Sequence, residues 1–333
     1  MSVRKIMNLL GLTETTNAPT SGAAKKPATV FVDGGSGTTG LGINERLKLQ
    51  DDVVVKTIAD DKRKDPAAKK ALMEEVDLVI LCLPDDAAKE TVALIDSMGA
   101  SAPKVLDAST AFRVASDWTY GFPELTPDQA DKIRTARKVS NPGCYPTGGI
   151  ALLRPLVDAG LVPANYPVTI NAVSGYSGGG KSMIASFEDG SAPSFELYGL
   201  GFEHKHLPET QLYAKLTRRP IFVPSVGNYR QGMLVSVPLH LDMLPGKPGG
   251  ADLHAALAKR YADSTYVSVM PLENAATKLE PEALNETNKL ELYVFASEKH
   301  CQAVLVARLD NLGKGASGAA VQNMRLMLGL AEK

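Results

Sequence analysis

The segment ATVFVDGGSGTTGLGINERL, residues 28–47, joins a short apolar run to a glycine-rich turn and then to a helical pattern. The apolar run is rich in valine and phenylalanine, as is typical of a buried β-strand. In the turn, Gly35, Gly37 and Gly40 match GxGxxG, and Gly34, Gly37 and Gly40 match the variant GxxGxxG. A strand, a glycine turn and a helix in this order predict a dinucleotide-binding unit.

The glycine turn suits phosphate groups for a geometric reason. Residues without a side chain let backbone N–H groups approach a pyrophosphate at the N-terminus of a helix. Hydroxyl groups in the turn add further donors to the same phosphates. We therefore expect a cofactor-binding set made of Gly34, Ser36, Gly37, Thr38, Thr39 and Gly40.

Strand-like and helical segments alternate through the rest of the first half. Apolar strands are expected at 28–34, 53–60, 77–84 and 104–110. Helices are expected from the glycine turn onward, and then at 65–76 and 85–98. Near-continuous apolar strands that alternate with helices are typical of a parallel sheet covered on both faces. The predicted fold class is therefore α/β, with an N-terminal Rossmann-like domain.

The end of the second expected strand bears on the choice between NAD and NADP. An acidic residue at this point bonds a ribose 2′-hydroxyl and favours NAD. Here Asp60 and Asp61 are followed at once by Lys62, Arg63 and Lys64. The basic triplet suits a 2′-phosphate, so we expect NADP(H) with Arg63 among its ligands. A solvated charged turn is the alternative interpretation.

The composition sets limits on function. The 333 residues are 44% hydrophobic and 22% charged, with a formal net charge of −1. No basic excess indicates a nucleic-acid partner, and no basic amphipathic helix indicates a membrane surface. The longest apolar stretch, 76–84, is shorter than the roughly 18 residues that a membrane span needs. A chain of this length suits two domains.

Three cysteines without an even framework indicate a reducing compartment, and we expect a cytoplasmic protein. Cys82 lies in an apolar run and Cys301 beside another, so both are expected to be core residues. They form no CxxC pair, and no metal site is expected. Residues 1–27 are expected to form a leader or linker, and an organelle presequence is the alternative there.

The third cysteine has a different setting, in SNPGCYPTG at 140–148. Pro142 and Gly143 break regular structure just before it, and the apolar run IALLRPLV follows soon after. Cys144 is therefore expected at the N-terminus of a helix. This position favours the thiolate, which is the nucleophilic form of the side chain.

The pattern changes after Cys144. A strand that ends in a glycine-rich turn is expected in 167–181, and 222–241 alternates as antiparallel strands do. Two later runs, LELYVFASE and CQAVLVARL, are also strand-like. These segments predict a second, α+β domain whose sheet forms one wall of a cleft.

A nucleophilic thiol needs a base, and later an acid for the group it expels. The segment EHKHLPE holds two of the five histidines, His204 and His206, and an imidazole suits both tasks. Candidate cations for an anionic substrate are Arg113, Lys181 and Lys205, although each alone is more often a surface charge.

A dinucleotide fold with a Cys–His pair indicates the phosphorylating aldehyde dehydrogenase reaction. In that scheme the thiolate attacks an acyl phosphate and forms a thioester, and hydride transfer from NADPH gives a thiohemiacetal that collapses to an aldehyde. Extra cations would hold the phosphate group. The residues indicate this class of reaction but not the substrate.

The chain resembles the short form of the N-acetyl-gamma-glutamyl-phosphate reductase family from about residue 28 to the C-terminus. Eight segments in order carry the resemblance: GSGTTG, LPDDAA, LDASTAFR, YGFPEL, SNPGCYPTG, SGYSGGGKS, EHKHLPE and LDNLGKGASGAAVQN. The resemblance implies NADPH-dependent reduction of N-acetyl-gamma-glutamyl phosphate to N-acetyl-glutamate 5-semialdehyde and phosphate, in arginine biosynthesis.

The resemblance also implies roles for individual residues. It makes Cys144 the nucleophile, favours His206 over His204 as the acid/base, and places Asn311 near the cofactor, with a closing helix after it. The motifs alone do not separate the two histidines. The substrate-binding residues that we expect on this basis are Arg113, Asn141, Lys181, His204 and Glu209.

The expected domains follow from the same segments. Residues 28–143 and 311–333 would form the NADP-binding domain, and 144–310 a catalytic and oligomerisation domain, as in glyceraldehyde-phosphate-dehydrogenase-like enzymes. The second, sheet-rich domain is expected to make a homo-oligomer, a dimer or tetramer, because a large apolar sheet face needs covering. Asp33 stands where the family usually has an apolar residue, which would disturb the end of the first strand.

Three alternatives stay open. The same mechanism would serve another acyl phosphate, such as aspartyl or aminoadipyl phosphate. A nucleotide-sensing protein would keep the fold without turnover, which an intact Cys–His pair argues against. A Cys–His hydrolase would have no use for the glycine turn at 34–40.

Overall fold

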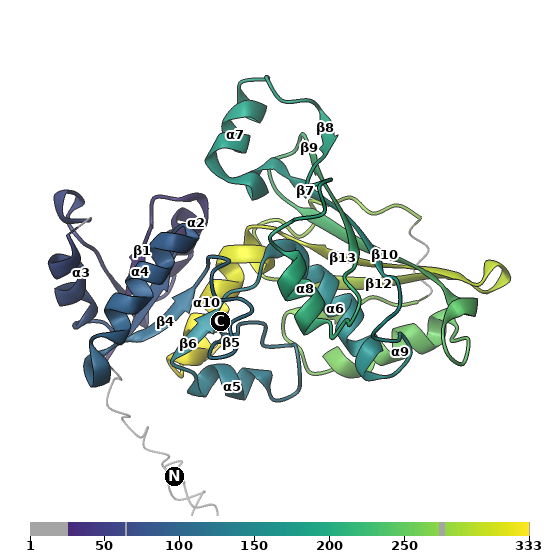
Figure 1. Ribbon diagram of the computed structural model, residues 1–333, viewed down its shortest axis with the longest axis horizontal. Coiled ribbons are helices and arrows are strands. Elements are labelled where there is room, and N and C mark those ends of the chain that lie inside the picture. Colours follow the sequence, from purple (N-terminus) through teal and green to yellow (C-terminus); the bar gives the residue numbers. More distant parts are fainter. Residues whose placement is uncertain (1–25, 64, 273–276, 333) are drawn as a thin grey trace, which may run out of the picture.

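The computed structural model describes residues 26–63, 65–272 and 277–332, and most of the expected leader at 1–27 lies outside them. Two β-sheets lie next to each other, with the first half of the chain mainly in one and the second half mainly in the other (Figure 1). Within the described residues, no helix is long and apolar enough to cross a membrane.

The first sheet has six parallel strands in the order β2-β1-β3-β4-β6-β5. Its strands are β1 (Ala28–Asp33), β2 (Val53–Lys56), β3 (Leu78–Leu81), β4 (Lys104–Asp107), β5 (Thr119–Tyr120) and β6 (Lys138–Ser140). The four expected strands are confirmed, although each ends before its expected last residue. The last two strands are too short to show a periodic pattern.

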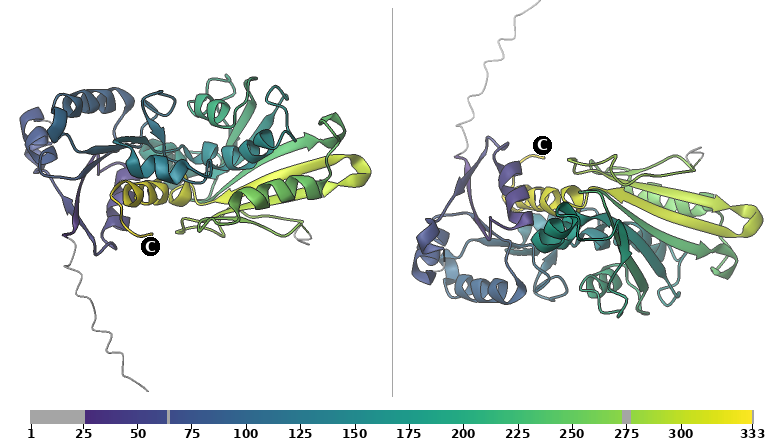
Figure 2. Two further views of the ribbon diagram at one scale, coloured as in Figure 1. Left: turned by 90° about the horizontal axis from the view of Figure 1, so that it is seen from below. Right: turned by 90° about the horizontal axis from the view of Figure 1, so that it is seen from above.

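Helices cover both faces of this sheet, as the sequence predicted. One face packs against α2 (Thr38–Leu47), α5 (Gln129–Thr135) and α10 (Gly318–Met327). The other face packs against α3 (Pro66–Met73) and α4 (Asp85–Asp96). Figure 2 shows α10, in yellow, beside the purple α2, so the end of the chain returns to the first sheet.

The expected disturbance at Asp33 is not observed. The strand β1 runs through Asp33, whose backbone pairs with that of Leu81. The Asp33 carboxylate lies 2.7 Å from Nζ of Lys69, on α3. A buried carboxylate with a cationic partner avoids the large cost of an unpaired buried charge, so the strand tolerates this residue.

The second sheet has seven strands in the order β11-β12-β13-β10-β7-β9-β8. Its strands are β7 (Thr169–Gly175), β8 (Phe195–Leu197), β9 (Ile221–Gly227), β10 (Met233–His240), β11 (Val267–Val269), β12 (Leu290–Ser297) and β13 (Gln302–Leu309). The expectation for 222–241 was partly wrong, because β9 pairs in parallel with β7 and β10 is not its neighbour. Period-two alternation does not distinguish parallel from antiparallel pairing.

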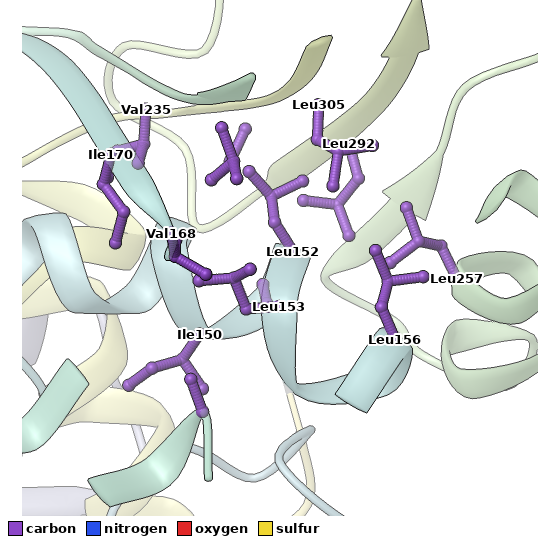
Figure 3. Close-up of a cluster of buried hydrophobic side chains, with 14 of the residues drawn as sticks. Ile150, Leu152, Leu153, Leu156, Val168, Ile170, Val235, Leu257, Leu292 and Leu305 are labelled. Carbon is purple, nitrogen blue, oxygen red and sulfur yellow. The ribbon is translucent and has the colours of Figure 1, made fainter. Parts of the chain in front are cut away.

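Helices cover one face of the second sheet: α6 (Cys144–Asp158), α8 (Leu207–Tyr213) and α9 (Gly250–Tyr261). Figure 3 shows leucines of α6, such as Leu152 and Leu156, among side chains of the strands and of α9. Burial of each such side chain contributes roughly 1.5–3 kcal/mol. This core holds the N-terminus of α6 in place.

A long connection from β7 to its parallel neighbour β9 carries the histidine segment. It includes the short helix η3 (Tyr176–Gly179), α7 (Gly180–Glu188), β8 and α8. In Figure 1, α7 and β8 project above the sheet, while α8 lies back against α6. The remaining short helices are η1 (Asp60–Lys62), η2 (Gly99–Ser101), η4 (Leu241–Met243), η5 (Glu298–His300) and η6 (Gly313–Ser317).

The two cysteines that were expected in cores differ. Cys82 is partly buried and packs against the core of the first sheet, in line with the expectation. The expectation for Cys301 was wrong, because this residue is exposed in the turn between β12 and β13. A strand-like run next to a cysteine does not say whether the cysteine belongs to the strand or to its turn.

A buried carboxyl group ends β4. The Ser109 hydroxyl donates to Oδ2 of Asp107 at 2.6 Å, and Oδ1 has no hydrogen-bond partner among the described residues. Burial raises the pKa of Asp107 from 3.8 to about 6, although Ser109 and the charge of Arg113 favour the carboxylate. Because the folded protein holds this proton more tightly than the unfolded chain, Asp107 reduces stability as the pH rises through 6.

We predict a pH dependence that Asp107→Asn removes. Between pH 4 and pH 8, the wild-type free energy of unfolding should fall by about 2–3 kcal/mol relative to that of the variant. Urea denaturation at the two pH values measures this difference, and the comparison cancels any constant cost of the amide. Identical pH dependence in the two proteins would contradict the assignment.

Candidate active site

Cys144 is the first residue of α6, as the sequence predicted. Gly143 precedes it in an extended conformation, and no side chain caps this end of the helix. The N–H group of Tyr145 lies close enough to favour the thiolate of Cys144. On another side, Gly315 packs so tightly that a side-chain carbon built on it would lie 2.8 Å from Cβ of Cys144.

The helix end does not by itself produce a thiolate. Burial raises the pKa of the Cys144 thiol to about 11, although the Tyr145 N–H group and the Arg113 guanidinium lower it. The sequence predicted that the helix N-terminus would favour the thiolate, and in the structure the loss of solvation outweighs that effect. The thiol is therefore protonated at neutral pH, and a nucleophilic role for it would require a base.

Arg113 and Glu209 form a buried ion pair next to Cys144. Nη1 of Arg113 donates to Oε1 of Glu209 at 2.6 Å. The Tyr120 hydroxyl and the Gly143 N–H group donate to Oε2 at 2.7 and 3.1 Å. Nε of Arg113 donates to the carbonyl of Asn141 at 3.0 Å. The pair therefore fixes the loop at 141–143, which precedes Cys144: Arg113 bonds its first residue and Glu209 its last.

Two tyrosines that the sequence analysis missed support this pair. The ring of Tyr120 stacks on that of Tyr213, with centroids 3.7 Å apart. The Tyr213 hydroxyl donates to the carbonyl of Arg113 at 2.8 Å. Tyr120 lies in YGFPEL, one of the segments that carry the family resemblance, although no role was predicted for it. Tyr213 lies outside all of these segments, so nothing in the sequence indicated its role.

His206 lies beside the same loop. A side-chain carbon built on Gly143 would lie 2.8 Å from Nε2 of His206, 2.7 Å from Nη1 of Arg113 and 2.8 Å from Oε1 of Glu209. The imidazole is thus placed next to the residue that precedes Cys144. Nδ1 of His206 is buried and has no hydrogen-bond partner within the described part of the chain.

The two histidines of the segment differ in their surroundings. His206 is buried and His204 is partly exposed, with ring centroids 4.8 Å apart. Nδ1 of His204 accepts the backbone N–H of His206 at 3.2 Å. Burial holds the pKa of His206 well below its usual range and lowers that of His204 to about 4. Both are neutral at pH 7, and His206 therefore has a nitrogen without a proton, although its surroundings disfavour the charged imidazolium.

The two asparagines that were predicted as site residues, Asn141 and Asn311, are buried and hydrogen-bonded to other protein groups. Asn141 donates to the carbonyl of Ala316 at 3.1 Å and accepts from Asn323 at 3.0 Å. Asn311 donates to Ser177 at 3.0 Å and accepts from the N–H of Gly232 at 2.8 Å. These bonds join the loop before Cys144 and the turn after β13 to their neighbours.

The glycine turn has the shape that a phosphate cradle requires. Gly34 has a φ of +85°, and a side chain on it would overlap the carbonyl of Cys82. A side chain on Gly40 would meet the backbone of Gly34 and Gly35. The helix α2 begins at Thr38 with Gly37 as its uncapped N-cap. The first N–H groups of α2 are therefore available to an anion.

The structure brings together only part of the expected site. Arg113, Asn141 and Glu209 meet at the loop before Cys144, and the two histidines lie beside them. Lys181 is exposed in the first turn of α7, and Arg63 is exposed just after η1. Among the described residues, no three His, Cys, Asp or Glu side chains are arranged to hold a metal ion.

Two family models define the class of protein. Residues 39–133 match "Semialdehyde dehydrogenase, NAD binding domain", and 144–311 match "Semialdehyde dehydrogenase, dimerisation domain". Aspartate semialdehyde dehydrogenase II from Vibrio cholerae has the same fold, with a TM-score of 0.68 and 15% identity over 92% of this chain and 99% of that one. The Candida albicans enzyme, solved with NADP, has a TM-score of 0.60 and 14% identity over 91% and 98% of the two chains.

Relatives of known name narrow the class. N-acetyl-gamma-glutamyl-phosphate reductase from Burkholderia lata is 53% identical over 91% of this chain and 97% of its own. The protein of the same name from Brucella suis is 53% identical over 90% and 98% of the two chains. The chain belongs to the N-acetyl-gamma-glutamyl-phosphate reductase family, which confirms the resemblance seen in its motifs.

Close packing around Gly143 yields a prediction about stability. Gly143→Ala should lower the free energy of unfolding by about 1–3 kcal/mol, because the new methyl group displaces the buried ion pair and the imidazole. Urea denaturation measures the change.

Gly149→Ala is the matched control in the same helix. The nearest atom to a side-chain carbon built on Gly149 is 3.7 Å away, which is an ordinary contact distance. This variant should be as stable as the wild type or more stable by up to about 1 kcal/mol. Equal effects of the two substitutions would mean that the contacts at Gly143 have no energetic consequence.

Proposed function

We propose that this protein reduces N-acetyl-gamma-glutamyl phosphate to N-acetyl-glutamate 5-semialdehyde with release of phosphate, using NADPH, as a step of arginine biosynthesis. The observation that carries the proposal is the position of Cys144 on an uncapped helix end, with Arg113 and His206 around the residue before it. The names of the relatives support the choice of substrate.

A nicotinamide dinucleotide fits the glycine turn, because the turn has no room for side chains at Gly34 and Gly40 and ends at an uncapped helix. Bound there, the dinucleotide would supply a hydride to the acyl carbon. We propose the whole expected set as its ligands, with Arg63 at the 2′-phosphate of NADP and Asn311 near the turn after β13. The free state of the three cysteines fits the reducing compartment of a cytoplasmic enzyme, which is part of the proposal.

The first half of the reaction depends on removing the thiol proton. We propose that neutral His206 takes this proton and that the sulfur of Cys144 attacks the acyl carbon, forming a thioester. The bond from carbon to the phosphate oxygen breaks, and His206 returns the proton to the departing phosphate. The charge of Arg113 stabilises the thiolate while it exists.

The second half returns the enzyme to its resting state. Hydride addition to the thioester gives a thiohemiacetal oxyanion on Cys144, which collapses to the aldehyde and expels the thiolate. The thiolate then takes a proton from water, so that one hydride and one proton are consumed in each turnover. Cys144 serves both halves, because its thiolate is the attacking group in one and the leaving group in the other.

The expected substrate residues divide into two groups by exposure. His204 is partly exposed and Lys181 is exposed, so we propose that these two contact the substrate directly. Arg113, Asn141 and Glu209 are buried and bonded to protein groups, and we propose that they form the inner wall of the site. We further propose that residues 28–143 and 311–333 form the NADP-binding domain and that 144–310 form the catalytic domain.

The decisive assay follows NADPH formation at 340 nm from N-acetyl-glutamate 5-semialdehyde, NADP and phosphate. Wild-type protein should turn over only with phosphate present, and Cys144→Ser should lose at least about a thousand-fold in kcat. The exposed Cys301→Ser is the matched control and should keep full activity.

The outcomes separate the alternatives. Turnover of aspartate semialdehyde but not of the acetylated substrate would reassign the enzyme to another acyl phosphate. NADPH binding without hydride transfer to any acyl phosphate or semialdehyde would indicate a nucleotide-sensing protein. Full activity of Cys144→Ser would refute the thioester mechanism.

The second sheet presents its other face to solvent, and we propose that a second copy of this chain covers it. The apolar side chains on this face line a cavity of about 510 Å³; they include Val173, Phe195, Leu197, Leu234, Phe295 and Val306. An exposed apolar face of this extent is typical of an interface. The family model for 144–311, described as a dimerisation domain, supports an oligomer.

Val304→Asp should therefore give a monomer, because it places a carboxylate among apolar groups that would face the partner. Val304 is 39% exposed in the single chain, so the monomer itself should fold. Leu49→Asp, at a residue 80% exposed beyond α2, is the control and should keep the wild-type assembly. Sedimentation velocity at micromolar concentration tests both, and a monomeric wild type would refute the proposal.

A further inference from the structure

One buried ammonium group has no role in the proposed reaction. The side chain of Lys314 is only 1% exposed, and its Nζ contacts Oε1 of Glu124 at 2.8 Å and Oε1 of Gln322 at 2.7 Å. The same Nζ lies 5.7 Å from the ring centroid of Phe122 and 5.1 Å from that of Tyr266. The charge is thus enclosed by one carboxylate, one amide and two aromatic rings.

Stability alone is a weak reason for such a group. Removing two charges from water is costly, and replacing a buried ion pair with apolar groups of similar volume is often neutral or stabilising. In some proteins a buried polar pair instead selects one arrangement of the backbone. The effect of the Lys314–Glu124 ion pair therefore depends on the contacts made by the backbone segment that carries Lys314.

Lys314 lies in η6, a single π-helical turn between β13 and α10. On one side of this turn, Gly315 packs against Cβ and Cα of Cys144, and the Ala316 carbonyl accepts from Asn141. On the other side, the Ser317 hydroxyl accepts from Nε of Arg46, on α2. The turn thus touches both the nucleophile and the helix of the glycine turn.

Nζ of Lys314 bonds to residues outside η6. Glu124 belongs to the YGFPEL segment after β5, and Gln322 belongs to α10. Lys314 therefore links η6 to the segment after β5, and Gly315, the next residue of the same turn, packs against Cys144. A π-helical turn is a rare backbone form that often marks functional sites.

We propose that Lys314 is a positioning residue for Cys144: its ion pair with Glu124 holds the turn 313–317 against the nucleophile and so sets the direction of the thiol. The inference rests on the proposed function for its consequence in turnover, but its geometric part concerns the thiol alone. A looser turn would misdirect the sulfur and at the same time uncover it to small reagents.

The test replaces both members of the pair, Lys314→Met with Glu124→Gln, so that no unpaired charge stays buried. Four quantities are measured: kcat and KM in the semialdehyde assay, the rate of Cys144 alkylation by iodoacetamide at pH 8, and the melting temperature. We expect kcat to fall by about ten-fold to a hundred-fold with KM within about two-fold. Alkylation should become faster, by about three-fold or more, because the sulfur is less covered.

A general loss of structure would also uncover Cys144 and speed its alkylation, so the melting temperature separates the two explanations. Positioning predicts the opposite changes in turnover and alkylation at a melting temperature no lower than that of the control variant. The matched control is Arg325→Met with Asp52→Asn, which removes the ion pair between the buried Arg325 of α10 and the partly exposed Asp52, with Nη2 and Oδ2 2.8 Å apart. The control should leave kcat and alkylation within about two-fold of the wild type.

Two results would overturn the proposal: kcat and alkylation that both stay near wild type in the double variant, or changes in kcat and alkylation that the control variant shares. If the double variant does not fold, Glu124→Gln alone is measured against the same expectations. If the wild type shows no turnover with the semialdehyde, the proposed function fails, and the alkylation comparison still decides the role of Lys314.

Discussion

Most of the candidate site depends on the buried ion pair between Arg113 and Glu209. One carboxylate receives the guanidinium, the Tyr120 hydroxyl and the N–H of Gly143, and the guanidinium in turn bonds the carbonyl of Asn141. Breaking a buried pair by removing one partner typically costs 3–5 kcal/mol. Because residues 141–143 lead directly into α6, the pair that holds them also sets where Cys144 begins its helix.

Burial of the site also explains the protonation states of Cys144 and His206 before substrate binds. A site closed by aromatic rings and glycines removes solvent from Cys144 and from His206, which raises the pKa of the thiol and lowers that of the imidazole. Both groups are then neutral, and moving one proton between them creates the nucleophile and the acid together. The nearby positive charge of Arg113 favours the thiolate but disfavours a protonated His206. The resting site therefore holds two neutral groups.

Two segments of the second half of the chain pack back against the loop and helix that contain Cys144. The connection between β7 and β9 carries the histidines and Glu209 over to the loop before α6. After β13, the turn at η6 passes Cys144 and α10 closes the first sheet beside α2. Each segment brings groups more than fifty residues apart in the sequence into hydrogen-bonding distance: the Gly143 N–H donates to the Glu209 carboxylate, and the Asn323 side chain donates to that of Asn141.

The sequence by itself determined the local features: the glycine turn, the four apolar strands around it, and Cys144 at a helix N-terminus. These depend on periodicity and on glycine and proline positions, which act over a few residues. Only the tertiary structure decided that Arg113 pairs with Glu209, that β9 lies parallel to β7, and that Cys301 is exposed. It also decided the protonation of Cys144, because desolvation depends on every neighbour that excludes water, and those neighbours come from distant parts of the chain.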